Sequence, residues 1–189
     1  MTTRELRPDD IRTGQAYEAV RADARYAVAE AQQHRRVQLG ETLCLVFESR
    51  ESIRASLEEM LRAERITDPV EVEQDVEAFN AFVPGPRRLG ATLYVEASDP
   101  ADLGALVPEL RAVLGTLFVE VGGEEVRAAR LDDAESPEAA ASFVVFDLND
   151  DQARRWRGGS SVAVGVRHPR FATTVALTEE QTRAIGAEL

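Results

Sequence analysis

The sequence predicts an α+β fold: a mixed, mostly antiparallel sheet with helices packed on one side and a helical arm at the N-terminus. The first observation is the order of the patterns. Helix, strand, helix, helix, strand and helix come first, and a run of strands follows from Gly115. The second is the Gly122-Gly123 pair between two alternating apolar runs, which is typical of a two-residue hairpin turn and so of antiparallel strands.

The chain of 189 residues has the length of one domain. We expect a single domain over residues 1–189. Within it, residues 1–36 form the helical arm, 37–114 an α/β half and 115–189 a strand-rich half. Apolar residues make up 44% of the chain, which is enough to fill a sizeable core.

The helical arm is predicted from a stripe of small apolar residues. Residues 8–34 carry them at steps of three and four, namely Tyr17, Val20, Ala24, Ala27, Val28 and Ala31. Gly14 is a point at which this helix can divide. Because the stripe is mostly alanine, the helix can approach a neighbour closely. We expect that neighbour to be a second subunit, in a homodimer.

Residues 35–66 combine a strand with a highly charged helix. The segment Val37–Glu48 is apolar on both faces up to its last residue, which predicts a central strand. Ser49 is a suitable N-cap for a helix over Arg50–Arg65. The apolar face of this helix consists of Ile53, Leu57, Met60 and Leu61. A neighbouring stripe, which allows a ladder of ion pairs, consists of Arg54, Glu58, Arg62 and Arg65.

The remaining elements follow from caps, turns and alternation. Helices are expected after the N-caps Asp68, Asp99 and Asn149 or Asp150, and after Thr178, which forms a capping box with Gln181. Strands are expected over Ala91–Ala97, Leu117–Val121, Glu125–Arg130, Ser142–Leu148, Ser161–Arg167 and Phe171–Leu177. The acidic, alanine-rich residues 131–140 are expected to form a loop.

Charge and hydropathy exclude several classes of function. The formal net charge of -12 disfavours binding to nucleic acid or to an anionic membrane surface, because a polyanion is repelled. No apolar run approaches the roughly 18 residues of a membrane helix. The N-terminus also lacks the apolar core of a signal peptide. We therefore expect a cytoplasmic protein that binds neither nucleic acid nor membrane.

The residue types that are missing exclude further chemistry. All 22 basic side chains are arginine, which rules out a Schiff-base lysine, a lysine general base and a P-loop lysine. The single cysteine, Cys44, rules out an intrachain disulfide and a cysteine-rich zinc site. Because Cys44 lies within an apolar strand, we expect an inert buried thiol with a raised pKa.

One cluster of charged residues is the best candidate site. Its members lie in and around the strand and helix of residues 35–66: Arg36, Glu48, Glu59, Arg62, Glu64, Arg65 and Glu96. Glu64 falls near the apolar stripe of its helix, so we expect its carboxylate to be partly buried and paired. Such a cluster can grip an anionic small molecule or act in acid–base catalysis. It can equally be an ion-pair network that locks the helix to the sheet.

Two further candidate sites are weaker than the Arg/Glu cluster. Four of these glutamates and His168 could in principle hold iron or manganese. However, the sequence has no Glu-x-x-His pair and no His-x-Asp/Glu spacing, so no metal is predicted. His168 is more typical of a turn histidine bonded to backbone. The run Arg154–Arg157 could bind a phosphate or an acidic partner, but a solvated helix end with Trp156 packed inward is the simpler interpretation.

Several motifs in this chain resemble an uncharacterised bacterial family, domain of unknown function three-five-zero-one. The resemblance rests on Arg36-Val37, Leu39-Gly40, Phe47-Glu48, Glu59-Met60-Leu61-Arg62, Glu64-Arg65-Ile66, Asn80, Pro84, Ala91-Thr92, Glu96 and His168-Pro169. Genes of that family tend to lie beside rubrerythrin-like proteins and iron–sulfur oxidoreductases that resemble heterodisulfide reductase subunits. The resemblance implies an accessory role in such a redox system, with a redox protein as partner. It implies no activity, ligand or cofactor.

Two hypotheses of function follow. The first is a non-catalytic accessory or interaction protein, homodimeric through the alanine-rich helix, that serves redox enzymes. The second is a protein that binds an anionic metabolite, or an enzyme acting on one, through the Arg/Glu cluster, with bound iron as the less favoured variant. The first is preferred, because no nucleophile–base pair can be assembled from the sequence.

Overall fold

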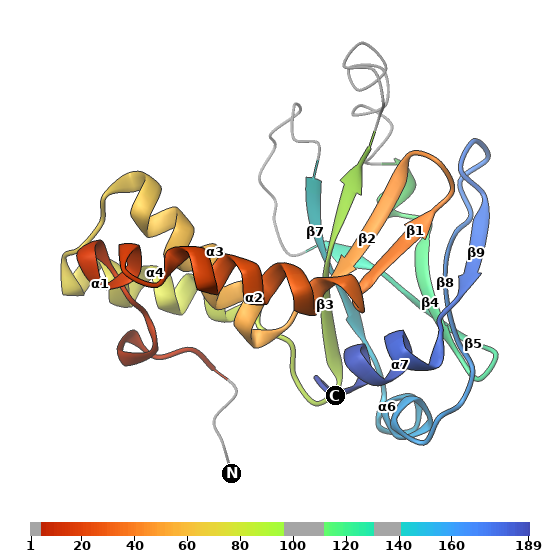
Figure 1. The fold of residues 1–189 in the computed structure, drawn as a ribbon. Helices are drawn as coiled ribbons and strands as arrows, with labels where there is room; N and C mark the ends of the chain where they lie inside the picture. The colour runs from red at the N-terminus through yellow and green to blue at the C-terminus, as the bar shows by residue number, and fades with distance from the viewer. Residues whose placement is uncertain (1–4, 97–111, 131–140) are drawn as a thin grey trace.

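Two antiparallel sheets form the centre of the structure, a computed structural model that describes residues 5–96, 112–130 and 141–189 (Figure 1). The first sheet has the strand order β1 (Arg36–Leu39), β2 (Leu43–Phe47), β3 (Arg88–Val95), β7 (Ala141–Asp147) and β6 (Ala129–Arg130). The second has the order β5 (Glu124–Arg127), β4 (Leu117–Val121), β8 (Val162–Val166) and β9 (Thr173–Ala176).

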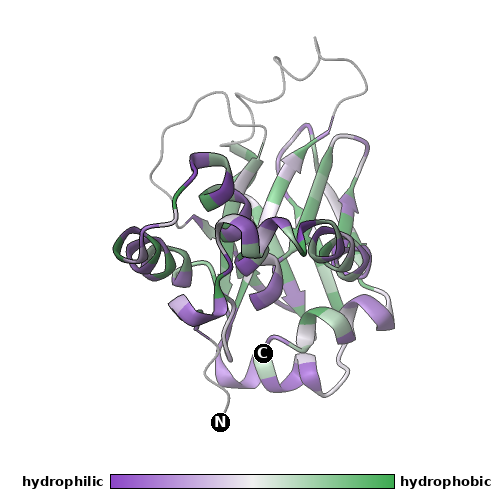
Figure 2. Ribbon diagram, turned by 60° about the vertical axis from the view of Figure 1, so that its left-hand side comes forward, coloured by the Kyte–Doolittle hydropathy of each residue, from purple (hydrophilic) through white to green (hydrophobic). Residues whose placement is uncertain are grey.

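The main apolar core lies between the two sheets. Alternate residues of β2, such as Leu45 and Phe47, pack with Val119 of β4 and Val164 of β8, and all four are fully buried. The ring of Phe47 meets the ring of Trp156 edge-on, with 6.4 Å between centroids. The strands are accordingly the greenest part of the ribbon in Figure 2. Burial of this area on both sheets supplies most of the hydrophobic stabilisation.

Helices cover the other face of the first sheet. They are a 3-10 turn (Pro8–Asp10), α1 (Gly14–Glu18), α2 (Arg21–Gln33), α3 (Arg50–Glu64) and α4 (Pro69–Asn80). A second, smaller apolar cluster joins α3 to α4 through Leu57, Leu61, Val72 and Val76. The remaining helices, α6 (Asp150–Arg157) and α7 (Glu179–Gly186), lie at one end of the sheets (Figure 1). The predicted α+β fold class is confirmed.

Local signals placed several boundaries correctly. The Ser49 hydroxyl accepts a hydrogen bond from Ser52 N at 3.1 Å and caps α3, as expected of an N-cap. The predicted hairpin forms between β4 and β5, with Val121 opposite Glu124. Its turn residues Gly122 and Gly123 have φ values of 57° and 86°, which residues with a Cβ rarely adopt.

Three expectations are corrected. Val37–Glu48 is not one strand but the hairpin of β1 and β2, because the chain turns at Gly40, whose φ is 72°. The single predicted sheet is two sheets. Their membership does not follow the predicted halves, since β6 and β7 join the first sheet. The predicted helix over residues 8–34 is broken into the 3-10 turn, α1 and α2. The shared core supports the single domain, which stays a prediction.

Two expectations lie outside the described residues: the helix that begins at Asp99-Pro100 and the acidic loop of residues 131–140. Within residues 5–96, 112–130 and 141–189, no helix has the length and apolar character needed to cross a bilayer.

Candidate functional site

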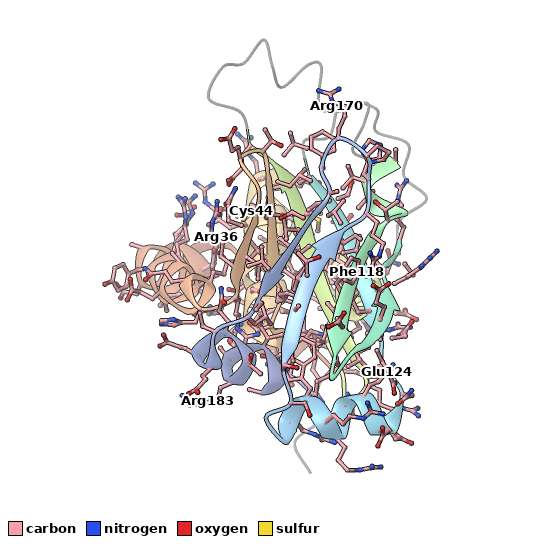
Figure 3. All side chains as sticks on the ribbon, turned by 90° about the vertical axis from the view of Figure 1, so that its right-hand side faces the viewer. Arg36, Cys44, Phe118, Glu124, Arg170 and Arg183 are labelled. Atoms are coloured by element: carbon pink, nitrogen blue, oxygen red, sulfur yellow. The ribbon has the colours of Figure 1, made fainter. Side chains whose placement is uncertain are left out.

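The predicted Arg/Glu cluster does not form one site. Arg36 and Glu96 make an ion pair at the edge of the first sheet, where the two side chains are 47% and 39% exposed. Figure 3 shows Arg36 at the surface of the strands, beside the helical layer. Neither residue lines a described pocket. This pair therefore links β1 to the end of β3 and leaves the other predicted site residues elsewhere.

Glu59 and Arg62 belong to contacts between α3 and the N-terminal segment. Glu59 accepts hydrogen bonds from Arg21 Nε at 2.7 Å and from the Tyr17 hydroxyl at 2.9 Å. The bond from Arg21, with a smaller contribution from Tyr17, holds the pKa of the Glu59 carboxyl below its usual value. Arg62 pairs with Glu18 at 2.6 Å. The expected ladder along α3 is thus not formed, because Glu58 and Arg62 pair with the N-terminal segment and Arg54 pairs with Glu51.

The expectation that Glu64 is partly buried is wrong. Leu61 is the last buried residue of α3, and the helix continues past its apolar partners into solvent. Glu64 and Arg65 are both exposed, and no ion pair joins either of them to another residue of the described part of the chain. Arg65 closes the helix in the left-handed conformation, with φ 61°. Helical periodicity places Glu64 on the apolar side of α3, but no other part of the described chain covers that side at Glu64.

Glu48 is buried as part of a hydroxyl network. Its side chain accepts from the Ser52 hydroxyl at 2.5 Å and from the Thr92 hydroxyl at 2.6 Å. The nearest guanidinium, that of Arg35, donates to the backbone oxygen of Glu48 at 3.3 Å instead of to the carboxylate. Because Ser52 also accepts from Ser49 N at 2.8 Å, this network fixes the start of α3 against β2 and β3.

A pocket beside this network is the best candidate site. It lies between α2 and the first turns of α3 and has a volume of about 340 Å³, within the usual range for small-molecule sites. One wall is the apolar stripe of α2: Val20, Ala24, Ala27, Val28 and Ala31. The opposite wall carries polar groups of Arg12, Arg35, Ser49, Glu51, Ser52 and Arg54, and α2 adds those of Asp23 and Gln32. No residue of α2 is buried, so the stripe is only partly covered by the rest of the described chain.

The arginines of this pocket are largely neutralised. Arg12 makes a bidentate ion pair with Glu58, whose side chain is fully buried, at 2.7 and 2.8 Å. Arg35 pairs with Glu188 at 2.7 Å. Arg54 differs, because its Nη2 pairs with Glu51 at 2.6 Å while its Nε is buried without a hydrogen-bond partner in the described structure. A buried N–H without an acceptor costs about 1–3 kcal/mol.

The pocket offers groups suited to binding, together with the carboxylates of Asp23 and Glu51. It combines an apolar wall, one unused buried donor and no thiol. The hydroxyl of Ser52 is committed to the capping network described above. Among the described residues, no group of three His, Cys, Asp or Glu side chains is arranged to hold a metal ion.

Sequence reasoning missed the pocket although it noticed parts of it. The alanine stripe of α2 was interpreted as a subunit contact, and Arg54 as a member of an ion-pair ladder. The sequence does not show which surface lies opposite each of these segments. Nothing local shows that the stripe of α2 lies opposite the first turn of α3.

The minor candidates behave as the simpler interpretations predict. Cys44 is fully buried, and burial raises the pKa of its thiol to about 11. His168 accepts from the backbone of Arg170 at 3.4 Å, as a turn histidine does. Trp156 is 1% exposed and packed inward, and its indole N–H donates to the carbonyl of Thr182 at 2.9 Å.

A solved structure and a family model both match this chain. One is a crystal structure of a novel protein of unknown function from Burkholderia pseudomallei K96243, with 27% sequence identity and a TM-score of 0.88. The similarity covers 97% of this chain and 98% of that one. No curated protein matches the chain. The family model described as "Protein of unknown function (DUF3501)" matches residues 5–189, which confirms the resemblance seen in the motifs. The chain therefore belongs to the DUF3501 family of proteins of unknown function.

Proposed function

We propose that this protein binds a small molecule between α2 and α3, and that the ligand has an apolar body and an acceptor oxygen. The observation that carries the proposal is the buried Nε of Arg54, which has no hydrogen-bond partner in the described structure, in a pocket whose other wall is apolar. An apolar body would cover the stripe of α2. A carbonyl or carboxylate oxygen would accept from Arg54.

This proposal moves the predicted ligand site and changes part of its chemistry. The Arg/Glu cluster predicted from the sequence is replaced by neighbours of its members: Arg35 beside Arg36, Ser49 beside Glu48, and Arg54. In both sites, an arginine donates a hydrogen bond to an oxygen of the ligand. The larger apolar wall favours a ligand that is less charged than the predicted anionic metabolite.

Octanoate is a suitable probe, because it has an apolar chain and one carboxylate. We expect saturable amide chemical-shift changes in α2 and in the first turns of α3 when octanoate is titrated in NMR experiments. Ala27→Phe fills the pocket and should weaken binding more than tenfold. Ala29→Phe is the matched control, because Ala29 is exposed on the same helix and does not line the pocket. Equal effects of the two substitutions, or no saturable shifts at all, would contradict the proposal.

The second candidate is the accessory role implied by the family resemblance, exercised through a homodimer. One observation favours it: Tyr26, on the outer face of α2, is 69% exposed, which is unusual for a large aromatic side chain. Analytical ultracentrifugation of the protein and of Tyr26→Glu tests the dimer, since a charge at a two-fold contact should favour the monomer. A redox protein as partner and a cytoplasmic location stay predictions. A pull-down against neighbouring redox proteins tests the first, and cell fractionation tests the second.

A further inference from the structure

We infer that the hollow between α6 and α7 is a second binding site, selective for a small molecule with a phosphate or carboxylate group. It has a volume of about 600 Å³ and lies at the end of the molecule where the two helices meet strands β8 and β9. Figure 3 shows Arg183 on α7, at the same end as α6. This hollow shares no lining residue with the pocket between α2 and α3.

The back of this hollow is held rigidly. Trp156 lines it, is 1% exposed, and is fixed by its hydrogen bond to the carbonyl of Thr182. A Cβ at Gly186 would lie only 2.8 Å from Trp156 Cδ1, so α7 approaches the indole as closely as glycine alone permits. A preformed wall of this kind lowers the ordering cost of ligand binding.

The charge of the hollow is what points to an anion. Arg157 and Arg183 both line it, and neither forms an ion pair with a side-chain carboxylate in the described part of the chain. Arg157 Nη1 donates at 3.3 Å to a main-chain oxygen of Leu189, the last residue of the described chain, whose main-chain oxygens form a carboxylate. This contact uses one of the five N–H donors of the guanidinium group. The chain carries a net charge of -12, so these guanidinium groups gather at the hollow against an acidic background.

The neighbouring arginines provide the contrast. Arg154 and Arg155, on the same helix, both pair with Asp151, and Arg155 also pairs with Glu124. The positive charges of those two arginines are balanced by carboxylates of the same chain. Arg157 instead meets the terminal carboxylate of Leu189, and Arg183 forms no ion pair with a side-chain carboxylate of the described residues.

The polar lining completes the site. Ser160 and Ser161 line the hollow beside the two arginines, and Glu179 is the one acidic side chain among the described lining residues. Among the side chains that line the hollow, two guanidinium groups stand against one carboxylate, and the terminal carboxylate of Leu189 lies beside Arg157. Guanidinium groups bind phosphate and carboxylate in a bidentate manner, and hydroxyls add donors to the same oxygens. The size suits a small metabolite and is too large for a single inorganic ion.

A simpler role for both arginines is interaction with the negative ends of α6 and α7, whose last turns they occupy. That role would affect stability alone. It predicts no dependence of anion binding on either side chain, so a binding measurement separates the two interpretations.

The chain has one tryptophan, Trp156, which makes its fluorescence a reporter for this hollow. We expect pyrophosphate, titrated at low chloride, to change the emission saturably, and isothermal titration calorimetry to give the same Kd. Arg157→Gln and Arg183→Gln should each raise that Kd at least tenfold. Arg154→Gln, a paired arginine on the same helix that does not line the hollow, should leave it within twofold.

The same titration with succinate distinguishes a carboxylate ligand from a phosphate ligand. Saturable binding of either probe that is lost in Arg157→Gln and Arg183→Gln supports the site, provided that circular dichroism shows both variants to be folded. The inference is overturned if calorimetry finds no binding of either probe, or if Arg154→Gln weakens binding as much as the other two substitutions do.

Discussion

The two layers of this protein are held together by different forces. Between the sheets, 24 buried residues of the described chain form one apolar cluster, whereas the helical layer has a cluster of seven. The N-terminal segment, residues 5–33, buries little beyond Leu6 and Tyr17. It is instead attached to α3 by ion pairs: Arg50–Asp10, Arg12–Glu58, Arg21–Glu59 and Arg62–Glu18. Apolar packing holds the sheets together, while charge holds one wall of the candidate pocket in place.

This difference indicates which part of the molecule should respond first to changes in pH and salt. Apolar burial is nearly independent of pH and salt, whereas ion pairs at a surface weaken as salt rises. The pocket between α2 and α3 has one wall from the electrostatically attached segment. We therefore expect conditions that leave the sheets intact to change the pocket first.

The largest effect on stability is expected in the apolar core between the two sheets. Leu45→Ala removes a fully buried side chain between the sheets and should lower the free energy of unfolding by about 2–5 kcal/mol. Urea denaturation monitored by circular dichroism measures the change. Because the loss is apolar, it should be the same at low and high salt. A loss that varies strongly with salt would show that the two layers are not distinct in the way described.

A smaller effect is expected at the best-buried ion pair. Glu58→Gln leaves Arg12 without its bidentate carboxylate and should cost about 1.5–3 kcal/mol. The matched control is Glu64→Gln on the same helix, where no ion pair is described and little change is expected. Amide hydrogen exchange should show that residues 5–33 open more readily in Glu58→Gln while the sheets stay protected. Equal protection of both layers would contradict the comparison.

The smallest effect is expected from pH, at Glu59 and Tyr17. The pKa of Glu59 is lowered in the folded state, chiefly by Arg21, so its contribution to stability is present above pH 4.5 and is lost as pH falls through the lower folded value. Burial raises the pKa of Tyr17 to about 12 from 10.0, so its contribution is present below pH 10 and is lost as pH rises towards 12.

The pH dependence is measured as a difference between variants. The stability gap between the protein and Glu59→Gln should narrow below pH 4.5. The gap between the protein and Tyr17→Phe should narrow above pH 10. Gaps that stay constant across both ranges would show that these two groups are not coupled to the attachment of the N-terminal segment.

Much of the fold could be predicted because its signals are local. The Ser49 cap, the Asp68 cap with Pro69 after it, and the Gly122-Gly123 turn each act within four residues, and each is found where it was predicted. The turn at Gly40 was missed although glycine was present there. The apolar pattern runs almost unbroken across the turn, so alternation alone does not reveal that the chain reverses.

The candidate site could be predicted only in kind. A site that binds its ligand through arginine was expected among Arg36, Glu48, Glu59, Arg62, Glu64, Arg65 and Glu96, whereas the pocket with Arg54 is lined by none of these residues. The particular residues were not predictable, because Glu58 and Glu59 are adjacent and equally charged in the sequence. Glu58 is buried against Arg12, whereas Glu59 meets Arg21 and Tyr17 nearer the surface. Partners 38 to 46 residues away decide the role of each.

By itself, the sequence determined most of the helices and strands, the antiparallel hairpin of β4 and β5, the absence of lysine and disulfide chemistry, and the family. Caps, turns and apolar periodicity act over a few residues and need no partner. Only the tertiary structure decided that the strands form two sheets, that Glu64 faces solvent, and that Arg54, Arg157 and Arg183 line hollows. Burial and ion pairing depend on which distant surface lies opposite, and no single segment contains that information.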